Sequence, residues 1–516
     1  MASKPHSTFP LRPKGQENGN EDRDRKAHLS LLTGTTGQHE LVEAVSTPIF
    51  TMPVLKHAET MQDKKSDVYP QYGLLAGKLE VLEKMLPQGP DTKLDPRLFF
   101  NIAAPSSTFI CGSQGSGKSH TLSCLLENCL LPSKASTLPH PLAGLVFHYD
   151  TFISDDGGSP CEAAFLSSNP NIKVRVLCSP TNIATIKVTY SQFKNVQVEP
   201  LRIDESNLNT KRMLDMMAVK RGEPLPLYLH SVMRILRAMR MKQQAEHTAF
   251  TYKDFKAQIM DARMSPAQIA PLEQRLSTLE SFLVEGQTGL AIYRQDRKRS
   301  DTKEEMRGNA WAHKPGYLTI VDLSCPCVTP EDACSLFNVC LTIFLEQEMT
   351  TGRVVALDEA HKYMNTSAEA DVLTSTLLST IRLQRHLGAR IIISTQEPTI
   401  SPALLDLSSV TIVHRFTSPD WLRALKQHLA AAASDIIDQD EDVSEDGTII
   451  GSKTKKIFQD IVKLRVGEAL LFSPSALVDV EWDKHLLKFK RLGTGYLKVK
   501  VRSRLTEDGG KSTMAS

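Results

Sequence analysis

Residues 107–119 read STFICGSQGSGKS, and the fold class is decided by this stretch. Its first five residues, STFIC, form a short β-rich run that predicts a buried strand. After the loop, leucines and cysteines recur at helical spacing from Leu122 to Leu130, and the pattern stops before Pro132. A strand, a glycine-rich loop and a helix in this order are typical of a phosphate-binding loop.

The loop itself, GSQGSGKS (112–119), fits the pattern G-x-x-x-x-G-K-[S/T]. Glycines let the backbone wrap closely, so that consecutive N–H groups point at phosphate oxygens, and the helix N-terminus adds its dipole. We expect Lys118 to bring its charge to the β- and γ-phosphates and the Ser119 hydroxyl to coordinate Mg²⁺. The residues expected to bind nucleotide are Gly112, Ser113, Gln114, Gly115, Ser116, Gly117, Lys118, Ser119 and His120. A loop that binds nucleotide without hydrolysing it would have the same pattern.

Two apolar runs downstream end in polar side chains. VVALDEAH (354–361) predicts a strand that ends at Asp358 and Glu359, and a buried parallel strand presents such carboxylates at the ligand edge of the sheet. We expect Asp358 to hold Mg²⁺ through water and Glu359 to orient or deprotonate the attacking water. The run IIISTQ (391–396) ends at Gln396, which we expect to sense the γ-phosphate or position water. The simpler alternative is that both strands end in solvated polar residues.

Three arginines are candidates for stabilising the charge that develops during γ-phosphate transfer, a role often filled by a neighbouring subunit. Arg382 and Arg385 lie in the helix that LLSTIRLQRHLG (377–388) predicts, and Arg415 lies at the end of the predicted strand VTIVHRF (410–416). The alternative for each is an ordinary solvated surface arginine.

Strands and helices alternate along the chain, which predicts a mostly parallel sheet flanked by helices. A helix is also predicted over 74–86, and amphipathic helices over 227–241 and 272–283 predict a helical insertion. The predicted strands are 107–111, 142–149, 174–178, 185–190, 317–324, 353–360, 390–396, 410–416, 467–472 and 496–505. The expected organisation is a largely disordered N-terminal region over 1–95, the first half of an ATPase core over 96–190, the helical insertion over 191–312, the second half of the core over 313–434, a mobile loop over 435–456 and a strand-rich C-terminal extension over 457–516.

Composition sets further bounds. The 516 residues are 41% apolar and carry 61 Lys and Arg against 59 Asp and Glu, a net charge of +2. This excludes a wholly disordered chain and gives no general basic coat, although a local basic channel could exist. No apolar run reaches the roughly 18 residues of a membrane span, and the N-terminus lacks the apolar stretch of a secretion signal. We therefore expect an intracellular protein without membrane contact, with nucleus and cytoplasm both open. The nine scattered cysteines fit a reducing compartment.

The segments VVALDEAHKYM (354–364) and IRLQRHLGARIIISTQEPTISPALLDLSSVTIVHRF (381–416) resemble the HerA/FtsK superfamily of P-loop ATPases. The matching positions are Asp358, Glu359, Arg382, Arg385, Gln396, Pro398, Pro402 and Arg415. The resemblance covers about residues 97–190 and 313–475. It implies a RecA-like P-loop NTPase fold, ATP and Mg²⁺ as cofactors, and a homo-oligomer, a hexameric ring, that pulls double-stranded DNA through its centre. The chain departs from the family at Glu397, where a basic residue is frequent, and in lacking an evident N-terminal β-barrel.

Two functions are consistent with these patterns. One is an ATP-hydrolysing, oligomeric DNA translocase. The other is an ATP-dependent switch or scaffold that binds a protein partner through the polar N-terminal region or the helical insertion. The letters DEAH (358–361) also occur in RNA helicases, but the arginine-rich QRxGR motif of a second helicase lobe is missing from the sequence.

Overall fold

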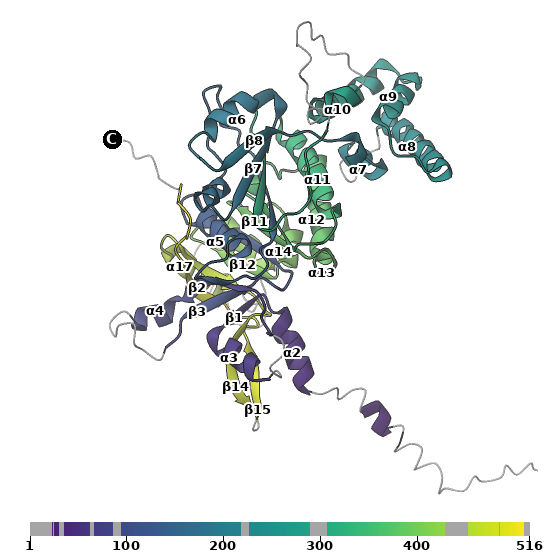
Figure 1. The fold of residues 1–516 in the computed structure, drawn as a ribbon. Helices are drawn as coiled ribbons and strands as arrows, with labels where there is room; N and C mark the ends of the chain where they lie inside the picture. The colour runs from purple at the N-terminus through teal and green to yellow at the C-terminus, as the bar shows by residue number, and fades with distance from the viewer. Residues whose placement is uncertain are drawn as a thin grey trace, which may run out of the picture.

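The computed structural model describes residue 23 and residues 25–29, 36–61, 67–85, 94–217, 226–288, 307–428, 452–483 and 486–509. A continuous sheet runs through the molecule, with helices on both of its faces (Figure 1). One half of the sheet consists of parallel strands. In spatial order they are β12 (Val410–Val413), β4 (Ser107–Cys111), β11 (Ala389–Thr395), β10 (Arg353–Leu357), β6 (Ala143–His148), β9 (Tyr317–Asp322), β7 (Lys173–Cys178) and β8 (Val196–Pro200).

The other half of the sheet is mostly antiparallel and combines strands from the two ends of the chain. Its strands, continuing outward from β12, are β13 (Glu468–Phe472), β16 (Leu497–Val501), β2 (Tyr72–Lys78), β3 (Arg97–Asn101), β1 (Ile49–Thr51), β14 (Leu477–Asp483) and β15 (Leu486–Arg491). The pair β1 and β14 is parallel, and the short β5 (Ser136–Thr137) pairs with β2. The fold is therefore a mostly parallel, mixed sheet flanked by helices, which confirms the predicted class.

Alternate residues of the parallel strands face opposite layers, because side chains on a strand alternate between the two faces. On β10, Val355 and Leu357 join the apolar cluster that contains α11 (Pro330–Glu346) and α12 (Ala368–Arg382), whereas Val354 and Ala356 join the one that contains α5 (Lys118–Leu130). The strand is apolar on both faces because helices cover both faces.

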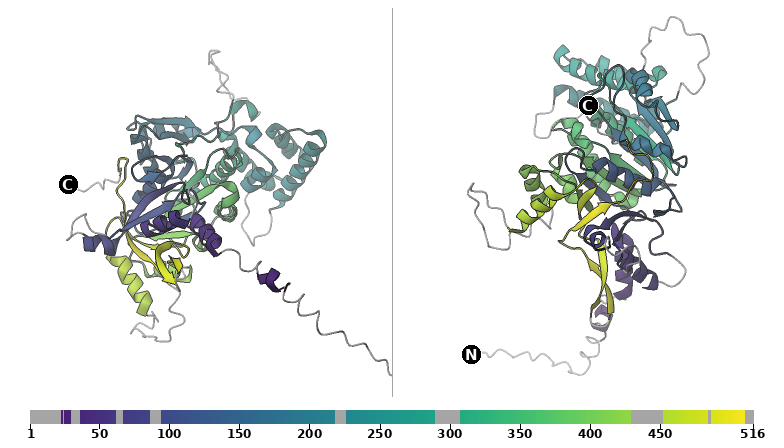
Figure 2. Two further views of the ribbon diagram at one scale, coloured as in Figure 1. Left: turned by 60° about the horizontal axis from the view of Figure 1, so that its bottom comes forward. Right: turned by 90° about the vertical axis from the view of Figure 1, so that its left-hand side faces the viewer.

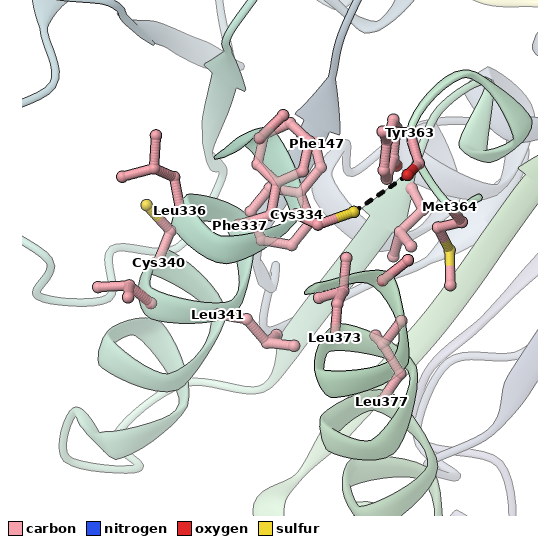
Figure 3. Packing of buried hydrophobic residues seen from close by; sticks show 14 of the residues in the cluster. Phe147, Cys334, Leu336, Phe337, Cys340, Leu341, Tyr363, Met364, Leu373 and Leu377 are labelled. Carbon is pink, nitrogen blue, oxygen red and sulfur yellow. Dashed lines mark hydrogen bonds between the residues drawn. The ribbon is translucent and has the colours of Figure 1, made fainter. Parts of the chain in front are cut away.

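Aromatic residues connect the sheet to α11 and to the turn after β10 (Figure 3). The ring centroids of Phe147 on β6 and Phe337 on α11 lie 4.6 Å apart, and those of Phe337 and Tyr363 lie 5.0 Å apart. The Cys334 thiol donates to the backbone carbonyl of Tyr363 at 3.1 Å. These contacts hold the chain that follows Glu359 against α11.

The helical insertion is present, with its start later than expected. Residues 196–200 form β8, the edge strand of the parallel half, so the sheet extends into the range predicted as insertion. The helices that follow are α7 (Thr210–Met216), α8 (Leu227–Glu246), α9 (Tyr252–Asp261) and α10 (Pro266–Phe282). Figure 2 shows them grouped at one side of the molecule, away from the mixed half of the sheet.

The N-terminal region is ordered over part of the range that was predicted to be disordered. It holds α2 (Thr36–Ser46), β1, α3 (Met52–Met61), β2 and α4 (Leu79–Met85), and Phe50, Val54 and Tyr69 are buried. The prediction failed because β1 is three residues long and its partners, β3 and β14, are distant in the chain. The predicted helix over 74–86 is likewise a strand, β2, followed by the shorter α4.

Other differences are local. Residues 185–190 were predicted as a strand because of their β-branched residues. Residues 185–189 belong instead to α6 (Ile183–Thr189), which buries Ile186 and Thr189 at helical spacing, and Tyr190 caps this helix. The C-terminal range contains α17 (Ser452–Lys463) as well as strands, and these strands complete the main sheet.

Residues 429–451, which include most of the predicted mobile loop, lie outside the described residues. Gly388 ends α13 (Gln384–Leu387) in the left-handed conformation. The remaining helices are α14 (Pro402–Leu407) and α15 (Pro419–His428).

We find no helix in the described ranges that is both long enough and apolar enough to cross a membrane.

Candidate functional site

The glycine-rich loop follows β4 and leads directly into α5. Gly112, Gly115 and Gly117 all have positive φ, at 153°, 70° and 110°, a region that residues with a side chain rarely adopt. A Cβ at Gly112 would lie 2.7 Å from the Cβ of His414. The conformation of the loop therefore requires glycine, and its backbone is held in the tight curve that exposes N–H groups.

Lys118 is folded into this loop. Its Nζ donates to the carbonyl of Ser113 at 3.1 Å, and the side chain is largely buried. Burial lowers the pKa of Lys118, while the nearby carboxylates of Glu359 and Asp358 oppose the shift. An ammonium group thus lies inside the curve of the loop, where a phosphate group would be bound.

The segment that follows β12 is hydrogen-bonded to the phosphate loop. The Ser113 N–H and hydroxyl both donate to the carbonyl of Arg415, at 2.9 and 2.8 Å. His414 Nδ1–H donates to the Glu468 carbonyl at 2.9 Å, so that Nε2 accepts from the Thr121 hydroxyl at 2.9 Å. Burial lowers the pKa of His414 to about 4. The imidazole is therefore neutral and ties α5 to β13.

The acidic end of β10 and the polar end of β11 meet, as the sequence predicted. The Gln396 side chain amide donates to Glu359 Oε2 at 3.1 Å, and the Gln396 N–H donates to His361 Nδ1 at 3.3 Å. His361 is neutral beside Glu359 for two reasons. Its Nδ1 accepts this hydrogen bond, and burial lowers the pKa of its imidazole. Glu359 has a φ of 46°, which is unusual for a residue with a side chain.

Asp358 is placed differently from its neighbour. It is 2% exposed, and its Oδ2 lies 3.3 Å from His148 Nδ1 and 3.7 Å from the Cys161 sulfur. Its Oδ1 is buried without a hydrogen-bond partner in the described part of the chain. Burial disfavours a charged His148, but Cys161, Asp322 and Asp358 raise its pKa well above the ordinary value. Asp358 thus lies behind the loop with one oxygen still free.

The phosphate loop and Glu359 line a cavity of about 410 Å³, which is within the usual range for a small-molecule site, whereas Asp358 and Gln396 are not part of its lining. From the loop and the strand ends, its lining comprises Gln114, Gly115, Gly117, Lys118, Ser119, His120 and Glu359. Gly112, Ser113 and Ser116 do not line the cavity but fix the conformation of the loop. Ser116 does so through a 2.7 Å hydrogen bond from its hydroxyl to the Ser113 carbonyl.

The C-terminal segment forms the opposite wall, which the sequence did not predict. Lys500, Ser503 and Asp508 line the cavity together with Glu162, Val466 and Gly467. His120 contacts this segment, since its Nε2 lies 2.8 Å from the Arg502 carbonyl and its Nδ1 lies 3.5 Å from Asp508 Oδ2. No motif marks these residues, because the alternation in LKVKV only predicted a strand with Lys500 on its polar face.

The three candidate arginines lie at opposite ends of the parallel strands: Arg415 at the carboxyl ends, and Arg382 and Arg385 at the amino ends. Arg415 is exposed beside the loop, through its backbone contact with Ser113. Arg382 ends α12, and Arg385 lines a groove with residues that directly precede β4. The phosphate loop follows β4, so Arg385 lies at the edge away from the loop of its own chain.

The residues present fit a nucleotide with Mg²⁺. The loop exposes backbone donors and holds an ammonium group, Ser119 lines the cavity, and the unpartnered Oδ1 of Asp358 provides a buried anionic acceptor nearby. Hydroxyl and carboxylate oxygens are the ligands that Mg²⁺ prefers.

No family model and no curated protein sequence matches the chain. Among solved structures, the plasmid coupling protein TrwB with a non-hydrolysable GTP analogue is similar at 11% identity, over 85% of this chain and 96% of that chain, with a TM-score of 0.43. VirB4 of Thermoanaerobacter pseudethanolicus is similar at 10% identity, over 84% of this chain and 97% of that chain, with a TM-score of 0.41. The genome packaging NTPase B204 from Sulfolobus turreted icosahedral virus 2, in complex with AMP, is similar at 14% identity, over 34% of this chain and 67% of that chain, with a TM-score of 0.21.

The fold assignment rests on the molecule's own features. These are the parallel strand order, the loop between β4 and α5, and the acidic end of β10 beside the polar end of β11. The chain has the fold of a RecA-like P-loop NTPase, and its motifs resemble those of the HerA/FtsK superfamily.

Proposed function

We propose that this protein binds and hydrolyses ATP and acts as an oligomeric motor on double-stranded DNA. The observation that supports hydrolysis most strongly is that Lys118 and Glu359 line one cavity, with Gln396 hydrogen-bonded to Glu359. A phosphate-binding cation and a positioned carboxylate at the same cavity are two parts that γ-phosphate cleavage requires.

Each residue has a distinct part in this proposal. The loop N–H groups and Lys118 bind the phosphates, and Lys118 leaves the Ser113 carbonyl to do so. Glu359 orients a water molecule and accepts its proton, and Gln396 fixes the carboxylate for this task. The Ser119 hydroxyl and, through water, Asp358 Oδ1 would hold Mg²⁺, which neutralises phosphate charge when bound.

Oligomerisation is proposed from the position of the arginines. Arg382 and Arg385 are exposed at the sheet edge that lies away from the loop. They are therefore placed to act only on the nucleotide of a neighbouring copy, whereas Arg415 can reach the loop of its own chain or of a neighbour. A ring of copies, as the motif resemblance implies, would bring these groups together.

DNA is proposed as the polymer because of an exposed basic row on the insertion. Arg234, Arg237 and Arg240 lie on α8 at intervals of three residues, and all three are exposed. Their opposite face, with Val232, Leu236 and Met239, is buried in the core. Such a row of guanidinium groups suits the regular phosphates of a duplex.

The test compares ATP hydrolysis with and without double-stranded DNA for the parent and for the combined variant Arg234→Ala/Arg237→Ala/Arg240→Ala. We expect DNA to stimulate ATP hydrolysis by the parent. The variant should lose most of this stimulation and keep the parent's rate of hydrolysis without DNA. Arg423→Ala, which removes an exposed arginine of α15, is the matched control and should keep the stimulation.

If DNA does not stimulate the parent, the motor proposal is wrong and the ATP-dependent switch that binds a protein partner becomes the better hypothesis. If stimulation survives in the triple variant, the polymer binds elsewhere and the role of α8 is wrong. Light scattering with and without ATP tests the assembly, since a particle that stays monomeric contradicts the ring.

A further inference from the structure

Three side chains of types that bind metal ions lie close together outside the lining of the nucleotide cavity. His148 is the last residue of β6, and Asp358 directly follows β10. Cys161 lies between β6 and β7, just before a short 3-10 helix at Glu162–Ser168. One ligand atom from each of the three lies within 4.8 Å of the others, and all three residues are buried.

The distances match those between ligands of a tetrahedral metal ion. Bond lengths of about 2.0–2.3 Å to nitrogen, oxygen and sulfur at tetrahedral angles put N and O about 3.4 Å apart and S and O about 3.6 Å apart. In the structure, Asp358 Oδ2 lies 3.3 Å from His148 Nδ1 and 3.7 Å from the Cys161 sulfur. The same oxygen is shared by both contacts, as a single coordinating atom would be.

His148 is also left without the hydrogen bonds that a purely structural role would supply. It is 5% exposed, and neither of its ring nitrogens has a hydrogen-bond partner in the described ranges, although Nδ1 lies within contact of Asp358. Buried polar groups are usually paired, so unpaired ones need an explanation. A bound cation would use the Nδ1 lone pair and the thiolate at once.

The donor types select the kind of metal. Thiolate and imidazole suit Zn²⁺ and related divalent ions, whereas Mg²⁺ prefers oxygen only. Three protein ligands leave one position open. Glu162 and Glu359, the neighbours of Cys161 and Asp358 in the chain, both line the nucleotide cavity, which therefore provides the entry path.

We propose that His148, Cys161 and Asp358 form a site for Zn²⁺ or a similar borderline-soft ion, distinct from the Mg²⁺ that accompanies nucleotide. Because Asp358 belongs to both sites, a Zn²⁺ ion on Oδ2 draws the negative charge of the carboxylate away from Oδ1, the oxygen proposed to hold Mg²⁺ through water. Bound Zn²⁺ thus inhibits ATP hydrolysis. This inhibition rests on the proposed ATPase activity, whereas the binding of Zn²⁺ to the site does not.

The test uses Co²⁺ as a spectroscopic probe on the full chain after treatment with a chelator. We expect one equivalent of Co²⁺ to give a thiolate-to-metal charge-transfer band, to be displaced by Zn²⁺, and to be lost in Cys161→Ser. Cys327→Ser, which changes an exposed cysteine outside the proposed site, is the matched control and should keep the band. Circular dichroism of each variant confirms that it is folded.

An absent band in the folded parent, or a band that survives Cys161→Ser, would overturn the site. In the same preparations, Zn²⁺ should lower ATP hydrolysis at least tenfold in the parent and much less in Cys161→Ser. Equal inhibition of both would overturn the link to Asp358. A parent that binds Co²⁺ at Cys161 but never hydrolyses ATP would contradict the proposed function and leave the metal site standing.

Discussion

At the scale of single residues, the backbone of Glu359 is the feature that most needs a functional explanation. A left-handed conformation in a residue with a side chain costs of order 1 kcal/mol or more, and such strain is concentrated at functional sites. The conformation turns the chain sharply after β10, so that Asp358 is buried while Glu359 lines the cavity. Two adjacent carboxylates thereby reach two different environments.

Gln396 fixes the Glu359 carboxylate, and Gln396→Ala should therefore slow hydrolysis while nucleotide affinity stays the same. A hydrogen bond to a charged group contributes about 1.5–3 kcal/mol, which corresponds to a loss of roughly 10–100-fold in turnover. Steady-state hydrolysis and nucleotide titration measure the two effects separately. Gln274→Ala, on the exposed side of α10, should change neither. A variant that loses affinity instead would place Gln396 on the nucleotide.

His414 makes stability depend on pH. Its pKa is about 4 in the folded chain and near 6.5 when unfolded, so the unfolded chain binds the extra proton between these values. Stability is then full above about pH 6.5 and falls as the pH drops toward 4, by on the order of 3 kcal/mol. His414→Asn keeps a donor for the Glu468 carbonyl but does not titrate.

Urea unfolding of both proteins across this pH range measures the contribution of His414 as a difference. We expect the parent to lose more stability on acidification than His414→Asn does. Parallel pH curves would show that His414 has the same pKa in the folded and the unfolded chain, contrary to the effect of its burial.

At the scale of elements, the segment after β16 is attached to the phosphate-loop helix. Glu127 on α5 is fully buried, and it accepts hydrogen bonds from the Arg502 guanidinium at 2.7 Å and from the Thr506 hydroxyl at 2.6 Å. The N–H groups of Leu505 and Thr506 donate to the same carboxylate. The position of α5 therefore depends on residues almost 400 positions further along the chain.

Arg502→Met should destabilise the protein by about 3–5 kcal/mol, because it leaves the Glu127 carboxylate buried without its cation. The double variant Arg502→Met/Glu127→Met should recover much of this loss, since neither charge remains. Denaturant unfolding of the parent, both single variants and the double variant gives the coupling energy. Additive losses would mean that the pair does not interact in the folded state.

Elements that are defined by local pattern were predictable from sequence, and elements that are defined by distant partners were not. The strands β4, β10 and β11 are continuous apolar runs, and their polar ends brought Glu359 and Gln396 together as expected, because parallel strands end at one edge. The strand β1 and the residues Glu162 and Asp508 gave no local signal. The position of β1 depends on its pairing with β3 and β14, and Glu162 and Asp508 are brought together by their ion pairs with Arg504, so no short window contains these contacts.

At the scale of the whole molecule, the sheet joins a parallel half, which holds the cavity, to a mixed half built from both chain ends. The cavity wall is itself shared between these parts, because Lys118 and Glu359 come from the first and Lys500 from the second. A motion of the mixed half relative to the parallel half would therefore change the shape of the site. In the proposed oligomer, Arg382 and Arg385 would act on the nucleotide of a neighbouring copy.

The central claim is that this cavity hydrolyses ATP through Glu359, and the most direct measurement is ATP turnover beside ATP binding for the parent and Glu359→Gln. Glutamine has nearly the shape of glutamate but cannot accept the proton of water. We predict that the variant binds ATP as tightly as the parent and hydrolyses it about 10²–10⁴-fold more slowly. Equal turnover in parent and variant, or a parent that binds no ATP, would contradict the account.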